Sequence, residues 1–240
     1  MIDRYQLKTR SSELCRTATP SLILTGVIYT LLSLVVSALS SRVMSGGFTM
    51  RDAELFLNAY NSGNYDRAIS IMNKFQPSGG AFAVDTALQI VMMLVSAGFT
   101  IFVLNTIRNS GASYGNLLDG FGIAGKIIVL NLVEGVLIGL WSLLLIVPGI
   151  IASYRYSQAL YILIDNPEKS VLQCIRESKE LMNGRKQELF VLDLSLIGWG
   201  LLGALIPLAT IWTAPYLRTI HALYYQELKK MESEEYFFNP

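Results

Sequence analysis

Long apolar stretches with almost no charge alternate with polar segments along this chain. The clearest apolar stretch runs from Leu22 to Leu39 and contains no charged side chain. Two more follow, over 87–104 and 127–147. The hydrocarbon core of a bilayer is about 30 Å thick, and a helix rising about 1.5 Å per residue needs roughly 20 residues to cross it. The pattern therefore predicts a polytopic helical membrane protein.

We expect an all-α transmembrane bundle that forms a single integral membrane domain over residues 1–240. Pro148-Gly149 is predicted to form a tight turn outside the membrane, between the third and fourth helices. Pro207 is expected to bend the fifth helix, and the sixth helix is short and polar. The six predicted spans cover residues 22–39, 87–105, 127–147, 150–164, 190–211 and 213–228.

One large polar loop, residues 40–85, separates the first two predicted spans, and its acidic and basic residues balance. Apolar positions at helical spacing, such as Leu55 and Phe56 and later Ile71 and Met72, predict two short amphipathic helices. Two interpretations stay open. The loop is either a helical hairpin lying on the outer membrane surface or a cap that binds a partner.

A second polar segment, residues 166–184, is predicted to form an amphipathic helix on the cytoplasmic side. Asn166 suits the N-cap position, Pro167 suits the first turn, and Gly184 suits the end of the helix. The longer stretch from Asp165 to Phe190 holds five basic residues, which fits the cytoplasmic face of a membrane protein. They are Lys169, Arg176, Lys179, Arg185 and Lys186.

The basic residues also predict the orientation of the chain. With these spans, 13 of the 19 Lys and Arg residues fall in cytoplasmic segments, four in the outer loop and two inside spans. Because basic residues are retained on the cytoplasmic side, both termini are expected there.

Composition excludes several classes of protein. The chain is 52% apolar and only 15% charged, whereas soluble domains average about 25% charged residues. The net charge of +1 gives no indication of nucleic-acid binding. Two cysteines, Cys15 and Cys174, and one histidine provide neither a disulfide framework nor a Cys/His zinc site. We expect no metal and no cofactor.

Two glycine patterns have simple structural explanations. Residues 120–126 satisfy the G-x-x-x-x-G-K spacing of a phosphate loop, but Ile127 stands where that loop needs serine or threonine, and no strand precedes it. Gly135 and Gly139 form a GxxxG pattern on the third predicted helix, which favours close packing against another helix.

Ionisable residues inside predicted spans are the best candidates for a functional site, because a charge in the bilayer interior costs at least about 2.5–3.5 kcal/mol. Arg155 and Arg218 are expected at similar depth, where two guanidinium groups could bind a lipid phosphate or a carboxylate. The alternative is that both arginines reach the interface or that one pairs with an acid. The candidate ligand or lipid-binding residues are Arg155, Arg218, Tyr154 and Tyr161, and the candidate intramembrane polar residues are Glu134, Asp193 and His221.

A short internal repeat also occurs. Residues 155–161 and 218–224 share the pattern R-x-x-x-A-L-Y. Duplicated helix pairs are common in transporters, but four matching positions can also arise by chance. Both explanations stay open.

Three motifs stand in the second half of the chain. Residues 148–157 read P-G-I-x-x-x-Y-R-Y-S, residues 165–167 read D-N-P, and residues 194–199 read L-S-x-I-G-W. With these motifs the chain resembles a family of uncharacterised integral membrane proteins, typical of Gram-positive bacteria, known as the domain of unknown function 975 family. The resemblance covers most of residues 113–228. It implies a multi-pass plasma-membrane protein, and it implies no activity, substrate or site residue.

We therefore expect a non-enzymatic multi-pass protein of the bacterial plasma membrane that acts in transport or export. The alternative is a scaffold, accessory or immunity protein that acts through the outer loop or the cytoplasmic helix. An intramembrane enzyme would need a nucleophile beside a base or two acids at one depth, and Glu134 and Asp193 lie on different predicted helices. The expected partners are the lipid bilayer and an anionic lipid, small molecule or peptide, with the oligomeric state left open.

Overall fold

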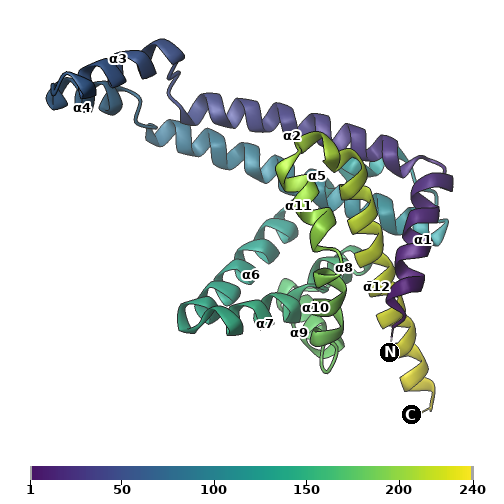
Figure 1. Cartoon of the computed structure of the whole chain (residues 1–240). Coiled ribbons are helices and arrows are strands. Elements are labelled where there is room, and N and C mark those ends of the chain that lie inside the picture. Colours follow the sequence, from purple (N-terminus) through teal and green to yellow (C-terminus); the bar gives the residue numbers. More distant parts are fainter. Residues whose placement is uncertain (1, 239–240) are drawn as a thin grey trace. The chain divides into compact units, whose positions relative to one another are not determined.

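The computed structural model describes residues 2–238, with side chains described through Glu234 (Figure 1). All secondary-structure elements in that range are helices and none is a strand, which confirms the predicted all-α class. The elements are α1 (Arg4–Thr17), α2 (Leu22–Met44), α3 (Met50–Asn61), α4 (Tyr65–Lys74), α5 (Gly79–Arg108), η1 (Tyr114–Ile123), α6 (Ala124–Leu144), α7 (Ile146–Tyr156), α8 (Ala159–Asp165), α9 (Val171–Leu181), α10 (Lys186–Leu194), α11 (Ile197–Leu205), η2 (Pro207–Ala209) and α12 (Thr210–Phe238).

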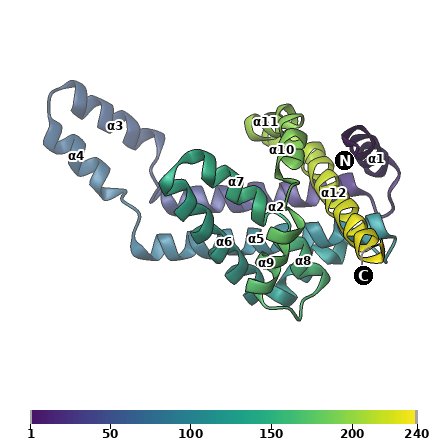
Figure 2. The ribbon, with the colours of Figure 1, turned by 90° about the horizontal axis from the view of Figure 1, so that it is seen from below.

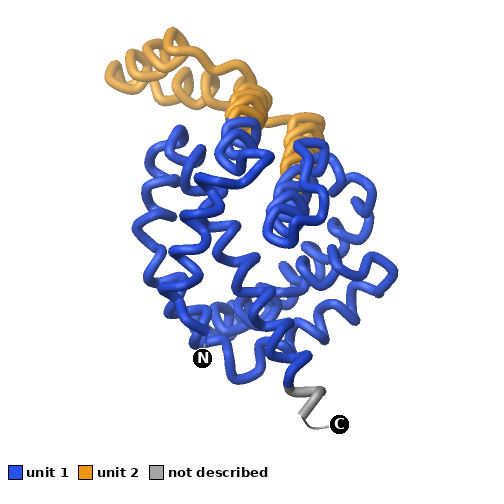
Figure 3. Tube along the Cα trace, turned by 90° about the vertical axis from the view of Figure 1, so that its right-hand side faces the viewer, with its two compact units in different colours: residues 1–30, 94–240 blue, residues 31–93 orange. Residues whose placement is uncertain are grey.

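The helices group into two compact units (Figure 3). The first unit comprises residues 1–30 and 94–240, and the second comprises residues 31–93. The long helices α2 and α5 each contribute residues to both units. The second unit also contains α3 and α4, which are the two amphipathic helices that the sequence predicts in the polar loop.

Three helices in the described range are long and apolar enough to cross a membrane. They are α2, α5 and the continuous segment Tyr114–Leu144, which joins η1 to α6. A fourth candidate arises if α10 and α11, which are bent by 54° relative to each other, form one broken span. Six spans therefore remain a prediction. In the segment 114–144, only 11% of the most apolar window is buried within the protein, so most of its apolar surface faces outward.

The predicted single helix over 150–164 is wrong in detail. The structure has two short helices there, α7 and α8, which are separated at Ser157 and Gln158. The predicted external turn at Pro148-Gly149 is also displaced, because the chain turns at Leu145 and both residues lie in the first turn of α7. Proline suits that position since its missing N–H would have no partner inside the helix.

One other local prediction differs from the structure, and one helix was not predicted. The cytoplasmic helix begins later, at Val171, because Ser170 forms a capping box with Gln173, while Asn166 ends α8. Gly184, with φ of +73°, follows the end of that helix as expected. The helix α1, capped by Asp3, was not predicted. Its Ser11 hydroxyl donates to the Tyr216 carbonyl at 2.9 Å and so joins α1 to α12.

The two copies of the R-x-x-x-A-L-Y pattern have different conformations. The first copy, 155–161, crosses the break between α7 and α8, whereas the second, 218–224, is continuous within α12. The shared letters therefore do not correspond to a shared local structure.

The core of the first unit lies between the second half of α5 and the middle of α12. Phe99 and Phe102 on α5 and Tyr224 and Tyr225 on α12 are among its largest fully buried side chains. Glycine allows η1 to approach α5 closely. A Cβ atom at Gly98 would lie 2.2 Å from the Leu117 carbonyl oxygen.

The glycines of the predicted GxxxG pattern do not make such a contact. A Cβ atom at Gly135 or Gly139 meets nothing within 4 Å among the described residues. Their surroundings are therefore open within the chain, and the close helix packing of this protein depends on other glycines.

We expect Gly98→Ala to destabilise the protein by about 1–3 kcal/mol, because the new methyl group must displace the backbone of η1. Gly139→Ala is the matched control in α6, where alanine should be neutral or slightly stabilising through its higher helix propensity. Thermal unfolding of both variants in the same detergent checks the prediction. Equal melting temperatures for the two variants would contradict it.

A second prediction concerns the start of α3, where Thr49 and Asp52 form a capping box. Hydrogen bonds from the Thr49 hydroxyl and backbone N–H lower the pKa of the Asp52 carboxyl. The folded pKa lies below the unfolded value, so this cap contributes fully above about pH 4 and is lost as the pH falls through the folded pKa.

We expect the first-turn amides of α3 to lose hydrogen-exchange protection when the pH is lowered from about 6 to about 3. Asp52→Asn should remove much of this pH dependence. Glu54→Gln takes a carboxylate out of the same helix without touching the cap and should preserve it. If Asp52→Asn left the pH dependence unchanged, the cap would not be its cause.

Candidate functional site

A polar pocket of about 300 Å³ opens among α7, α8, α10 and α12, all in the first unit. It brings together four of the seven predicted site residues, namely Tyr154, Tyr161, Asp193 and His221. No lysine or arginine is among its described lining residues. The lining consists of Ser153, Tyr154, Ser157, Gln158, Tyr161, Leu189, Asp193 and His221.

The break between α7 and α8 shapes one side of this pocket. The Ser178 hydroxyl of α9 donates to the Arg155 carbonyl at 3.1 Å and accepts from the Gln158 N–H at 3.1 Å. Ser178 is fully buried. One side chain thus replaces a helical hydrogen bond on each side of the break, which holds Ser157 and Gln158 in place.

Asp193 and His221 form the charged centre of the pocket. The imidazole Nε2 lies 2.7 Å from a carboxylate oxygen of Asp193. Both side chains remain about one-third exposed, at 32% and 39%, so the pair is open to its surroundings. The Tyr154 side chain lines the pocket with this pair.

The side-chain oxygen of Gln158, which also lines the pocket, accepts no hydrogen bond from the described residues. The residue is only 3% exposed, and its amide Nε2 donates to the Ser157 hydroxyl at 2.9 Å. The Oε1 atom is buried and has no hydrogen-bond partner among the described residues. Buried polar atoms are nearly always paired, so this acceptor is an unused hydrogen-bonding group in a residue that lines the pocket.

Arg218 lies on α12 outside the lining of the pocket, and its guanidinium is held within the first unit. It donates to the Ser96 carbonyl at 2.9 Å, to the Ser96 hydroxyl at 2.7 Å and to the Thr100 hydroxyl at 3.2 Å. The guanidinium carbon also lies 5.1 and 4.9 Å from the ring centroids of Tyr29 and Phe99. These neutral oxygens and aromatic faces solvate the charge and join α12 to α5 and α2.

The other two candidates stand apart from Arg218. Arg155 lies on α7, and its buried Nε atom has no described hydrogen-bond partner. Glu134 lies on α6 and makes no hydrogen bond or ion pair with the described residues. The two arginines share no described partner, so their joint anion site stays a hypothesis.

Sequence reasoning missed a second polar cluster, at the end of α8. Arg108 binds both carboxylate oxygens of Asp165 at 2.7 and 2.9 Å, and the Tyr225 hydroxyl donates to the same carboxylate at 2.8 Å. Asp165 belongs to the D-N-P motif, which is the only sequence signal that marked it. Tyr161 stacks on Tyr225 with centroids 5.1 Å apart, so this cluster supports one wall of the pocket.

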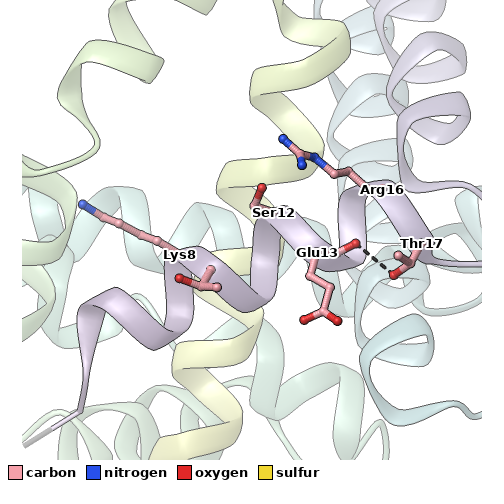
Figure 4. Close-up of a pocket in the computed structure, with 6 residues that line it drawn as sticks. Lys8, Ser12, Glu13, Arg16 and Thr17 are labelled. Atoms are coloured by element: carbon pink, nitrogen blue, oxygen red, sulfur yellow. Dashed lines mark hydrogen bonds between the residues drawn. The ribbon is translucent and has the colours of Figure 1, made fainter.

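A basic recess of about 500 Å³ lies on α1 (Figure 4). Its six lining residues all come from that one helix, and Lys8 and Arg16 supply positive charge. Figure 4 shows Arg16 and Glu13 extending to opposite sides of the helix. Because a single helix lines it, this is a surface feature, suited to contact with negatively charged groups and not to enclosing a ligand.

The described residues include no group of three His, Cys, Asp or Glu side chains that could hold a metal ion. The polar pocket offers hydrogen bonding at Asp193 and His221, between two tyrosine side chains.

Replacing Arg218 by methionine should destabilise the protein by about 2–3 kcal/mol, because several charge-assisted hydrogen bonds to Ser96 and Thr100 are lost. Arg176→Met, at an exposed position on α9, is the control and should change the stability by less than about 0.5 kcal/mol. Thermal unfolding in detergent measures both effects. Equal melting temperatures would show that the Arg218 contacts contribute little.

Comparison with known proteins identifies the family. Residues 88–232, more than half of the chain, match the sequence profile of a family described as Protein of unknown function (DUF975). The match contains the segment 113–228 that carries the resemblance and extends back into α5. No curated protein and no solved structure matches the chain significantly. The chain belongs to the DUF975 family.

Proposed function

We propose that this protein is a multi-pass protein of the bacterial plasma membrane, with both termini in the cytoplasm, that transports or exports a small ligand through the pocket at Asp193 and His221. The observation that carries the proposal is the polar pocket itself, in which a titratable pair and an unpaired acceptor adjoin a broken helix. Transporters commonly build their binding sites where membrane helices are interrupted.

The charge distribution supports a cytoplasmic opening for the pocket. Ser178, which holds the break, belongs to α9, and exposed charged residues of that helix include Arg176, Lys179 and Glu180. The helix α9 therefore lies in water or at the membrane surface. A pocket adjoining it can load a ligand from the cytoplasm, which is the side from which an exporter takes its substrate.

One observation favours the alternative function of a scaffold or accessory protein. The helices α3 and α4 expose large apolar side chains, including Met50 at 86%, Tyr65 at 58% and Ile69 at 58%. These residues offer a contact surface that a transport function does not need. A protein that acts in this way should be packed and dry between its helices.

Cysteine accessibility separates the two functions without knowledge of the ligand. In a Cys15→Ala, Cys174→Ala background, Ser157→Cys places a thiol in the pocket. For a transporter, a membrane-impermeant maleimide should label this thiol in inside-out vesicles and, more slowly, in right-side-out vesicles. The slow outer labelling reports the state in which the pocket opens to the other side of the membrane.

Ser153→Cys provides a second pocket position, and Ser233→Cys on α12 provides an exposed control. If both pocket cysteines stayed unlabelled in both kinds of vesicle while the control reacted, the pocket would be closed and the scaffold function favoured. Labelling from one side alone would indicate a static pocket and would contradict transport.

A further inference from the structure

The α6–α7 segment differs from an ordinary pair of spans in the composition of its turn. In both views the two helices join at one end as a hairpin (Figure 1, Figure 2). We infer that this hairpin is re-entrant: it enters the membrane from the cytoplasmic side, turns among the lipid acyl chains and returns to the same side.

The turn is entirely apolar and exposed. Five consecutive aliphatic residues occupy it, and their exposed fractions are among the largest of the described hydrophobic side chains. They are Leu143 at 84%, Leu144 at 69%, Leu145 at 68%, Ile146 at 77% and Val147 at 64%. Turns that face water are normally built from Gly, Pro, Asn, Asp and Ser. A tip of this kind is costly in water and is stabilised where hydrocarbon surrounds it.

Both far ends of the hairpin meet the polar segment around α9. Near the start of α6, the Lys126 ammonium donates to the carbonyls of Pro167 and Lys169, just before α9. At the end of α7, Ser178 of α9 bonds the Arg155 carbonyl. Because α9 carries exposed charges, the two ends of the hairpin lie at the level of water or lipid headgroups on one side.

The length of α7 then limits how deep the tip can reach. This helix has 11 residues, which corresponds to about 16 Å, or roughly half of a 30 Å hydrocarbon core. The sequence of α6 agrees with that depth. Its charged residues, Lys126 and Glu134, precede Gly135, as does Asn131. The ten residues from Gly135 to Leu144 contain no charge and one hydroxyl, that of Ser142. That apolar portion is about 15 Å long and matches α7.

Two hydrogen bonds hold the backbone at the tip. Only Leu145 lies outside the helices, its N–H donates to the Trp141 carbonyl at 3.3 Å, and its carbonyl accepts from Gly149 at 3.3 Å. Pro148 has no N–H to satisfy. Gly149 lies against Ser142, where a Cβ atom would clash at 2.1 Å, so the two arms cross tightly.

This topology alters the number of crossings and leaves the sides of the termini unchanged. The third and fourth predicted spans, 127–147 and 150–164, become one hairpin that does not cross. Removing two crossings from six keeps both termini on one side. The inference goes beyond the proposed function and does not depend on transport.

Site-directed labelling of the tip tests the inference. In the Cys15→Ala, Cys174→Ala background, Val147→Cys is treated with a membrane-impermeant maleimide in right-side-out and inside-out vesicles. Ser62→Cys in the polar loop and Ser233→Cys near the C-terminus are exposed controls for the two sides. We expect Val147→Cys to react at least about tenfold more slowly than either control, because the thiolate does not form in hydrocarbon.

A second readout identifies what covers the tip. The membrane-permeant dye monobromobimane, attached at Val147→Cys, should lose at least about half of its fluorescence in lipids brominated along their acyl chains, because the bilayer core surrounds the tip. Leu143→Cys, the most exposed tip position, repeats the measurement if the first variant folds poorly.

Two results would overturn the inference. Labelling of Val147→Cys from the outer side at the rate of Ser62→Cys would make the tip an external turn and restore two crossings. Slow labelling without quenching by brominated lipid would mean that protein, such as a second copy of this chain, covers the tip.

Discussion

Apolar surface that the protein itself leaves uncovered is the constraint on which the rest of this structure depends. In the segment 114–144 nearly nine-tenths of the most apolar window is unburied, and the tip of the α6–α7 hairpin exposes five aliphatic side chains in a row. Water disfavours such a surface at about 25 cal/mol per Å². An association with the membrane follows from that cost, and it requires each helix to pair its own backbone groups.

The same constraint explains how the polar side chains are arranged. Arg218 is surrounded by hydroxyl and carbonyl oxygens and two aromatic rings, and Asp165 receives hydrogen bonds from Arg108 and Tyr225. Asp193 and His221 pair with each other. Polar groups in an apolar surrounding are costly unless paired, so the few that are incompletely paired, such as Gln158, are informative about ligands.

The candidate site shows how far side-chain chemistry can be inferred before the fold is known. Four candidates can be picked from the sequence because they are polar or aromatic residues in apolar segments, and they line one pocket. They are Asp193, His221, Tyr154 and Tyr161. Arg218 can be picked from the sequence for the same reason, but its side chain joins α12 to α5. Gln158 and Ser178 could not be found from the sequence. They matter because they lie at or support the break between α7 and α8. No proline or glycine at that position indicates a break in the sequence.

The sequence by itself determined the properties that depend on local pattern: the all-α class, the apolar helices, the amphipathic pair α3 and α4, and the family. Hydrophobic runs and helix spacing act over short distances, so they can be read directly along the chain. Only the tertiary structure decided which polar residues meet, where helices break and where the chain turns at Leu145. Those features depend on contacts between distant residues, such as Ser178 with Gln158, and no local pattern specifies them.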